Sequence, residues 1–256
     1  MQFDADLNAC AALVEKGDPD RFAATMASPV AARRILFPLY AFNVEVSRAP
    51  WLTQEPMIAE MRLQWWRDAL EEIAEGTPVR RHEVVTPLAA CLDATGARLL
   101  DDLVAARRWD IGKDAFEDEA ALWQYLDATT GNLLWTAARA LDAAAEDEPD
   151  FRQVARAIAL ANWMQALPEL EARGKKPMHD GRPETLSQLA NTALSDLKRQ
   201  TRLSTPSRLV LLSGWRARGI LRRVQRTPQL VARGQLAEPA ILRSAALILA
   251  RLKRRI

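Results

Sequence analysis

Residues 154–167 read VARAIALANWMQAL, and Arg156 is the only charged residue among them. An amphipathic helix buries one face, whereas a helix that is apolar around most of its circumference is surrounded by other elements. The stretch therefore predicts a helix that is buried on most sides. Helices that surround another helix in this way form a bundle.

Prolines mark the expected beginnings of helices along the rest of the chain, as in Asp18–Pro19, Ser28–Pro29 and Thr205–Pro206. Proline suits the first helical turn, and the Asp, Ser or Thr before it is a good N-cap. Alternation typical of strands is missing. We predict helices near residues 3–16, 29–48, 55–75, 87–108, 118–128, 130–146, 149–172, 183–201, 206–226 and 238–255.

The fold class that follows is all-α, with about ten helices in one domain that spans residues 1–256. Pro38 lies inside a predicted helix and should kink it. The acidic stretch Asp142–Asp150 is interpreted as a solvated connection between helices. The stretch 173–183 (RGKKPMHDGRP) is interpreted as a basic loop.

The bulk composition is that of an ordinary globular protein, with 49% hydrophobic residues and a mean hydropathy of -0.18. The sequence offers no run of about 18 apolar residues, and its first residues lack a basic targeting segment. We therefore expect a cytoplasmic protein. Cys10 and Cys91 are far apart in the sequence and predict neither a disulfide nor a zinc site.

Charge is unevenly distributed, because residues 196–256 hold 15 basic and 2 acidic residues, whereas residues 1–195 hold 20 and 31. Such a basic region could contact anionic lipid, an acidic partner, nucleic acid or the acidic part of the chain itself. Its arginines lack aromatic interleaving or a recognition motif, so we expect no nucleic-acid binding. Peripheral contact with the inner face of a membrane is favoured.

Three stretches occur in an order that is typical of one family. They are RRILFPLYAF at 33–42, TTGNLL at 129–134, and ALANWM at 159–164 with Arg-Gly-Lys at 173–175. Together they resemble the squalene/phytoene synthases, which join two prenyl diphosphates head to head. The resemblance implies an isoprenoid synthase-like bundle around a central cavity.

The resemblance also implies two Asp-x-x-x-Asp pairs that hold Mg²⁺ against a leaving diphosphate. Counted from Tyr40 and Asn162, the four aspartate positions are occupied by Ser47, Trp51, Ala166 and Leu170. The nearby acids Glu45 and Glu169 each stand alone, and one carboxylate per helix is poor for binding several metal ions. We therefore expect no catalytic residue, no metal site and no cofactor, and Mg²⁺ only if the chain is an active synthase.

The corresponding helix faces predict a pocket of apolar and neutral side chains. Loss of four mutually repelling carboxylates should stabilise the helical core, so we expect a filled, dry cavity with Trp51 as one of the groups that fill it. Tyr40 and Asn162 could equally be hydrogen-bonded core residues. The candidate pocket residues are Tyr40, Asn43, Val44, Ser47, Trp66, Asn162, Trp163, Ala166 and Leu170.

The most distinctive stretch is RLQWWRDA at 62–69. It resembles a non-catalytic branch of the family that includes a mitochondrial complex I assembly factor. This implies a pseudoenzyme that binds a protein partner, such as a respiratory-complex subunit or assembly protein, with Arg62 and Arg67 on the partner surface. The alternative is an active prenyl transferase. Asp68 and Glu72 are interpreted as part of a solvated, salt-bridged face beside these arginines.

Overall fold

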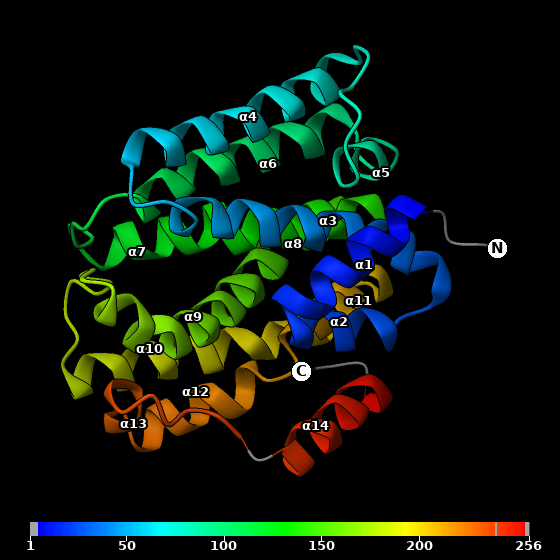
Figure 1. Ribbon diagram of the computed structural model, residues 1–256. Coiled ribbons are helices and arrows are strands. Elements are labelled where there is room, and N and C mark those ends of the chain that lie inside the picture. Colours follow the sequence, from blue (N-terminus) through cyan, green and yellow to red (C-terminus); the bar gives the residue numbers. More distant parts are fainter. Residues whose placement is uncertain (1–4, 239, 254–255) are drawn as a thin grey trace. The chain divides into compact units, whose positions relative to one another are not determined.

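The computed structural model describes residues 5–238, 240–253 and 256. Within these residues every regular element is a helix, which confirms the all-α fold class (Figure 1). The internal contacts divide the chain into two compact units. Unit 1 comprises residues up to Gly112 together with Asn132–Ala143, and unit 2 comprises Lys113–Gly131 and the residues from Ala144 onward. That residues 1–256 form a single domain stays a prediction.

Unit 1 is built from helices of which the longest are α3 and α4, and α4 packs along α6 while α1 packs against α3 (Figure 1). Its core includes the fully buried Leu36, Phe37, Phe42, Leu63 and Trp135. The elements are α1 (Ala5–Gly17), α2 (Pro19–Met26), α3 (Val30–Arg48), the 3₁₀ turn η1 (Ala49–Trp51), α4 (Pro56–Glu75), α5 (Val85–Ala89), α6 (Ala94–Ala106), the 3₁₀ turn η2 (Arg107–Asp110) and α8 (Asn132–Ala140).

Unit 2 is organised around the long helix α9, against which α10 and α12 pack. The elements are α7 (Glu119–Leu126), the π-helical turn η3 (Asp127–Gly131), the 3₁₀ turn η4 (Ala145–Asp147), α9 (Glu148–Ala172), α10 (Pro183–Asp196), the 3₁₀ stretch η5 (Leu197–Arg202), α11 (Thr205–Leu211), the 3₁₀ turn η6 (Leu212–Gly214), α12 (Ala217–Arg226), α13 (Gln229–Ala232) and α14 (Ala240–Lys253).

The stretch 154–167 lies within α9, and most of its residues are buried, including Ile158, Leu160 and Met164. This confirms the prediction of a helix buried on most sides. Pro38 lies inside α3 and is itself buried.

Two predicted helices are wrong because each is interrupted. The stretch 87–108 contains the end of α5, a turn, and α6. Asp93 begins α6 as its N-cap, since its Oδ1 accepts a hydrogen bond of 2.6 Å from the Gly96 amide. The stretch 206–226 is divided into α11 and α12, with η6 between them. The capping role of Asp93 and the helix break at η6 were therefore not predicted.

Other helix boundaries differ by smaller amounts. The predicted helices 118–128 and 130–146 correspond to α7 and α8 with η3 between them, and α8 ends at Ala140. The predicted helix 183–201 is α-helical to Asp196 and continues as η5. The short helices α2 and α13 were not among the predicted ranges. Residues 3–4, 239 and 254–255 of the predicted terminal helices lie outside the described residues.

Of the three predicted N-caps, Asp18 is confirmed, because its Oδ1 accepts a hydrogen bond of 3.0 Å from the Arg21 amide. Ser28 and Thr205 were wrong. The Ser28 hydroxyl donates instead to the Ala24 carbonyl of the preceding helix, and Thr205 is the first residue of α11. A Ser or Thr hydroxyl can donate a hydrogen bond to a backbone carbonyl of the preceding helical turn, as Ser28 does.

Asp147 corrects the interpretation of Asp142–Asp150 as a solvated connection. Its carboxylate is buried and accepts hydrogen bonds from the Ser204 amide at 2.9 Å, the Ser204 hydroxyl at 2.5 Å and the Ser207 hydroxyl at 2.6 Å. The connection before α9 thus holds the beginning of α11.

Among the described helices, none combines the length and the apolar character that crossing a bilayer requires.

Candidate functional site

The two positions on α3 and η1 where the family resemblance implies aspartates do not present metal ligands in this chain. The Ser47 hydroxyl donates a hydrogen bond of 3.1 Å to the Val44 carbonyl of its own helix. Trp51 is half-buried at the end of η1. Glu45, the nearest acid, lies 3.7 Å from Arg48 and forms an ion pair with it.

Tyr40 and Val44 share a face of α3, since they are four residues apart. Both side chains are buried. The guanidinium of Arg21 lies 5.4 Å from the centre of the Tyr40 ring. Val44 packs so closely on Gly17 that a Cβ at that glycine would overlap it. This face of α3 is therefore covered by α1 and α2, and glycine at position 17 permits the close approach.

An aromatic cluster joins α3, α4 and the segment after α4. The Trp66 ring meets Phe42 edge to face at 5.3 Å and Trp65 at 5.0 Å. His82 lies edge to face against both tryptophans, at 5.2 and 5.6 Å. Such edge-to-face pairs add stability beyond the area that they bury. The two tryptophans therefore have a packing role as well as any role in recognition.

Arg80 completes this cluster from the outside. Its guanidinium lies 4.9 Å from the centre of the Trp65 ring and donates hydrogen bonds of 2.6 and 3.0 Å to the Glu72 carboxylate. The hydrogen bonds from Arg80 lower the pKa of Glu72. The sequence had suggested Arg62 and Arg67 as neighbours of Glu72, but its partner is Arg80, because the chain turns back after α4.

A cavity of about 240 Å³ opens beside the aromatic cluster, entirely within unit 1. It combines aromatic, apolar and charged groups, with Arg62 exposed at its rim. Of the predicted pocket residues, Trp66 lines it. The lining residues are Glu45, Ala49, Leu52, Arg62, Trp65, Trp66 and His82.

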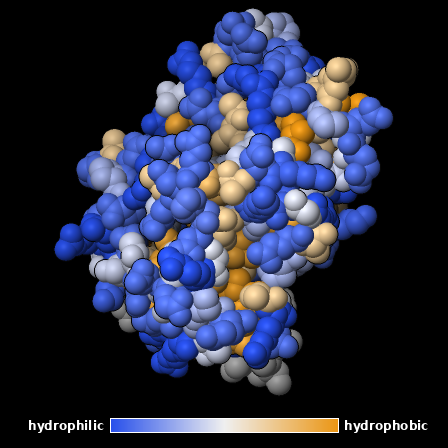
Figure 2. Space-filling view, turned by 90° about the vertical axis from the view of Figure 1, so that its left-hand side faces the viewer, coloured by the Kyte–Doolittle hydropathy of each residue, from blue (hydrophilic) through white to orange (hydrophobic). Residues whose placement is uncertain are grey.

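Apolar side chains are also exposed at Leu52, which follows η1 and lines this cavity, and on the first turns of α4. The exposed fractions are 49% for Leu52, 75% for Met57, 43% for Ile58 and 67% for Met61. The three α4 residues are spaced i, i+1 and i+4, so they share one helix face. We call these four residues the α4 surface. Figure 2 shows hydrophobic side chains exposed in separate places on one face of the molecule, among mostly hydrophilic ones.

The two arginines of the predicted partner surface differ. Arg67 is half-buried and donates hydrogen bonds of 2.6 and 2.8 Å to the two oxygens of Asp101 on α6. This bidentate pair raises the pKa of Arg67 and ties α4 to α6. Arg62 is exposed and has no ion-pair partner among the residues that the structure describes.

The α9 members of the predicted pocket lie in unit 2. Trp163 is buried against Tyr125 at 5.3 Å and Phe116 at 5.9 Å, and its ring N–H donates to the Pro177 carbonyl at 3.1 Å. Leu170 is buried, Ala166 is half-buried, and Asn162 is exposed. A polar, accessible Asn162 was not distinguishable from a core amide by sequence.

The donor set does not fit the magnesium ions that the family resemblance implies. The four expected positions hold Ser47, Trp51, Ala166 and Leu170. The Ser47 hydroxyl donates to its own helix, and the other three side chains carry no oxygen. Glu169 is bonded to Arg173 at 2.7 Å and is exposed, and Glu45 is paired with Arg48. Hard cations such as Mg²⁺ require several oxygen ligands, usually including carboxylates.

Comparison with known proteins places this architecture in a class. A family model for squalene/phytoene synthase matches residues 14–255, so the chain belongs to that family. The structure of a dehydrosqualene synthase in complex with ligand has a TM-score of 0.78 at 14% identity, over 97% of this chain and 96% of that one. Squalene synthase HpnC from Alicyclobacillus acidocaldarius has a TM-score of 0.71 at 16% identity, over 88% and 94%. At these identities the likeness shows the isoprenoid synthase fold.

Among curated proteins, the chain is similar to complex I assembly factor 6. The Drosophila melanogaster homolog of this NADH dehydrogenase (ubiquinone) assembly factor is 37% identical over 132 residues, which cover 49% of this chain and 39% of the relative. The Homo sapiens protein is 25% identical over 138 residues, which cover 49% and 38%. The matches thus span about two fifths of the length of these relatives.

Proposed function

We propose that this chain is a pseudoenzyme of the squalene/phytoene synthase family that binds a protein partner during assembly of a respiratory complex. The observation that carries the proposal is the α4 surface, where Met57 and Met61 are exposed on α4 and Leu52 is exposed in the lining of the tryptophan cavity. Aromatic, Met and Arg side chains are enriched at protein interfaces, and Met adapts its shape to an apolar partner.

The partner's chemistry follows from the groups that surround this surface. Exposed methionine and isoleucine side chains favour an apolar stripe on the partner, such as one face of an amphipathic helix. The exposed Arg62 favours an acidic side chain at the edge of that stripe. The similarity to assembly factor 6 supports the inference that the partner belongs to complex I or its assembly machinery.

Two further observations support the absence of synthase chemistry. The side chains at the four expected metal positions are Ser47, Trp51, Ala166 and Leu170, and the neighbouring acids are engaged by arginines. The alternative function, an active prenyl transferase, is favoured by the fold alone. Fold likeness does not carry chemistry from one member of a family to another.

Affinity purification from the native host tests the proposed function. We expect the wild-type chain to recover respiratory-complex subunits or assembly proteins. The double variant Met57→Ser/Met61→Ser should recover them at least about tenfold less, because it removes two exposed apolar anchors. Met26→Ser is the matched control, since Met26 is also exposed in unit 1 but lies on α2.

The identified partner would then be purified and titrated against the three proteins to obtain dissociation constants. Equal affinity of the wild type and the double variant would exclude the α4 surface as the binding site. Failure of the wild type to recover any respiratory-complex protein would contradict the assembly function itself.

A further inference from the structure

Helix α14 of unit 2 carries an apolar stripe that its own unit leaves uncovered. The exposed fractions are 59% for Ile248, 51% for Leu249 and 74% for Leu252. At about 100° per residue, these three side chains fall within one arc of roughly 100°. Ala250 lies on the opposite side of the helix and is buried. In the part of α14 whose side chains are described, residues 246–253, Ala250 therefore faces the protein, and Ile248, Leu249 and Leu252 face outward.

Basic side chains border the stripe on both edges. Arg251 lies about 60° before Ile248 on the helix circumference, and Lys253 lies about 40° beyond Leu249. Both are exposed. An apolar stripe between two basic edges is the arrangement of helices that lie in a bilayer interface, where the cations reach phosphate groups and the apolar side chains enter the acyl region.

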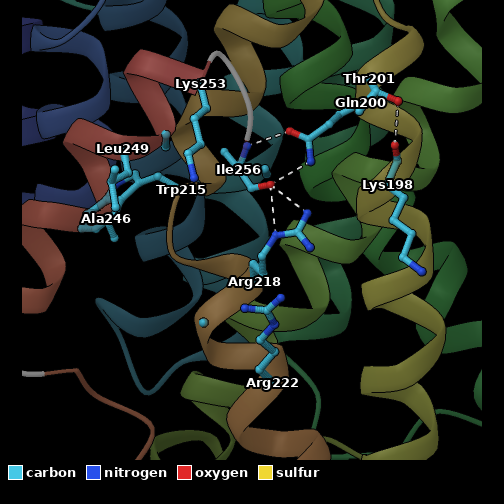
Figure 3. A pocket seen from close by; sticks show the side chains of 12 residues that line it. Lys198, Gln200, Thr201, Trp215, Arg218, Arg222, Ala246, Leu249, Lys253 and Ile256 are labelled. Carbon is cyan, nitrogen blue, oxygen red and sulfur yellow. Dashed lines mark hydrogen bonds between the residues drawn. The ribbon is translucent and has the colours of Figure 1, made fainter.

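A basic cavity of about 580 Å³ opens along the Leu249–Lys253 edge of this stripe (Figure 3). Four cations line it, namely Lys198 of η5, Arg218 and Arg222 of α12, and Lys253 of α14, and its lining includes no acidic side chain. Arg218 is engaged by the main-chain oxygen of Ile256, so Lys198, Arg222 and Lys253 are the cations that face an incoming anion. Lys198 and Arg222 are exposed. A cavity with this charge attracts anions, and phosphate is the anion that cationic side chains commonly bind.

The end of the chain that follows α14 is held against η5 and α12. The Ile256 amide donates to Gln200 Oε1 at 2.7 Å, and Gln200 Nε2 donates to the Ile256 carbonyl oxygen at 2.8 Å (Figure 3). Arg218 donates to the same oxygen through Nε at 3.2 Å and Nη2 at 3.0 Å. Gln200 is buried, so its two bonds with Ile256 form away from solvent, whereas the bonds from Arg218 are part-buried. These bonds hold Ile256 in the wall of the basic cavity.

We propose that the stripe Ile248–Leu252 and the adjoining basic cavity form a docking site for an anionic phospholipid bilayer, with a lipid phosphate group in the cavity. The charge of the cavity selects anionic over neutral lipid, and the stripe selects a bilayer over a dissolved phosphate. The two features lie on one helix edge, so a single orientation of α14 engages both. This inference is independent of the partner that binds the α4 surface.

Sedimentation with vesicles measures this interaction. We expect the protein to bind vesicles of phosphatidylcholine with phosphatidylglycerol, to bind vesicles of phosphatidylcholine alone far more weakly, and to dissociate as salt is raised. Ile248→Ser/Leu252→Ser should lower the partition coefficient roughly tenfold or more. Arg222→Ala and Lys253→Ala should each lower it about fivefold, and only on anionic vesicles.

Two control variants distinguish the loss of this site from the loss of any exposed cation or any exposed apolar side chain. Arg233→Ala removes an exposed cation of unit 2 that does not line the cavity, and Met26→Ser removes an exposed apolar group elsewhere. Both should bind like the wild type. Circular dichroism spectra that coincide would show that every variant is folded.

Three results would overturn the proposal. One is equal binding to neutral and anionic vesicles, and another is unchanged binding of the Ile248→Ser/Leu252→Ser variant. The third is competition by glycerol phosphate as effective as competition by intact anionic lipid, which would identify a site for a dissolved phosphate compound. Tighter binding to duplex DNA than to vesicles, lost on Arg222→Ala, would likewise replace the membrane with nucleic acid.

Discussion

Four single residues stand at the positions where the family resemblance implies metal-binding aspartates. Ser47 and Trp51 stand where the first aspartate pair is expected, and Ala166 and Leu170 stand where the second is expected. These differences were readable from the sequence, because they depend only on spacing. The ion-pair partners of the other acidic side chains could not be predicted from the sequence. Arg80, for example, reaches Glu72 only because the chain turns back after α4.

The pair of Glu72 and Arg80 makes a testable contribution to stability. Because Arg80 lowers the pKa of Glu72, the pair stabilises the folded state above the unfolded pKa of about 4.5, and this stability is lost as pH falls through the folded pKa. Glu72→Gln should lower the free energy of unfolding by about 0.5 kcal/mol at neutral pH, a value typical of partly solvated pairs. Urea unfolding measures it. A difference between variant and wild type that does not shrink in acid would contradict this prediction.

Removal of the Asp147 carboxylate should destabilise unit 2. Burial alone would raise the pKa of Asp147, but hydrogen bonds from Ser204 and Ser207 hold this pKa below its usual range. Asp147→Ala leaves the buried Ser207 hydroxyl and the half-buried Ser204 donors without their acceptor, so we expect a loss of about 2 kcal/mol in the free energy of unfolding. Glu146→Ala is the control, because Glu146 is exposed. Equal stability of the two variants would show that the Asp147 network is unimportant.

Elements were predictable where periodicity alone determines them. The helices α4 and α9 were expected within about one residue of their observed bounds, because long apolar patterns and a proline at the start define them. The breaks at Asp93 and at η6 were not expected. The first depends on a capping side chain, and the second coincides with a close tertiary contact that no local pattern reveals.

That contact joins η6 to α9. A Cβ at Gly214 would overlap the Ile158 side chain, including its branched Cγ2 at 2.9 Å. Gly214→Ala should therefore lower the free energy of unfolding by roughly 2 kcal/mol through overpacking. Chemical denaturation of Gly214→Ala, Ile158→Ala and the double variant measures the coupling. The double variant should be more stable than the sum of the single effects implies, and strict additivity would contradict the close contact.

At the scale of the molecule, the sequence predicted the family and the all-α fold because ordered motifs extend over most of the chain. It did not predict the α4 surface or the α14 stripe, since exposure of an apolar residue depends on what packs over it. His82 likewise gave no signal in sequence, although it packs on both tryptophans of the RLQWWRDA stretch. The family fold was therefore predictable, whereas the exposed surfaces on which the two proposals rest were not.

The most direct test of this account is incubation of the purified protein with farnesyl diphosphate, or with geranylgeranyl diphosphate, and Mg²⁺, followed by extraction and chromatography of the products. We predict no squalene, phytoene or related condensation product above the level of a protein-free blank. Clear turnover by the wild type that disappears in Glu45→Gln or Glu169→Gln would contradict it and would establish a prenyl transferase that uses a different set of carboxylates.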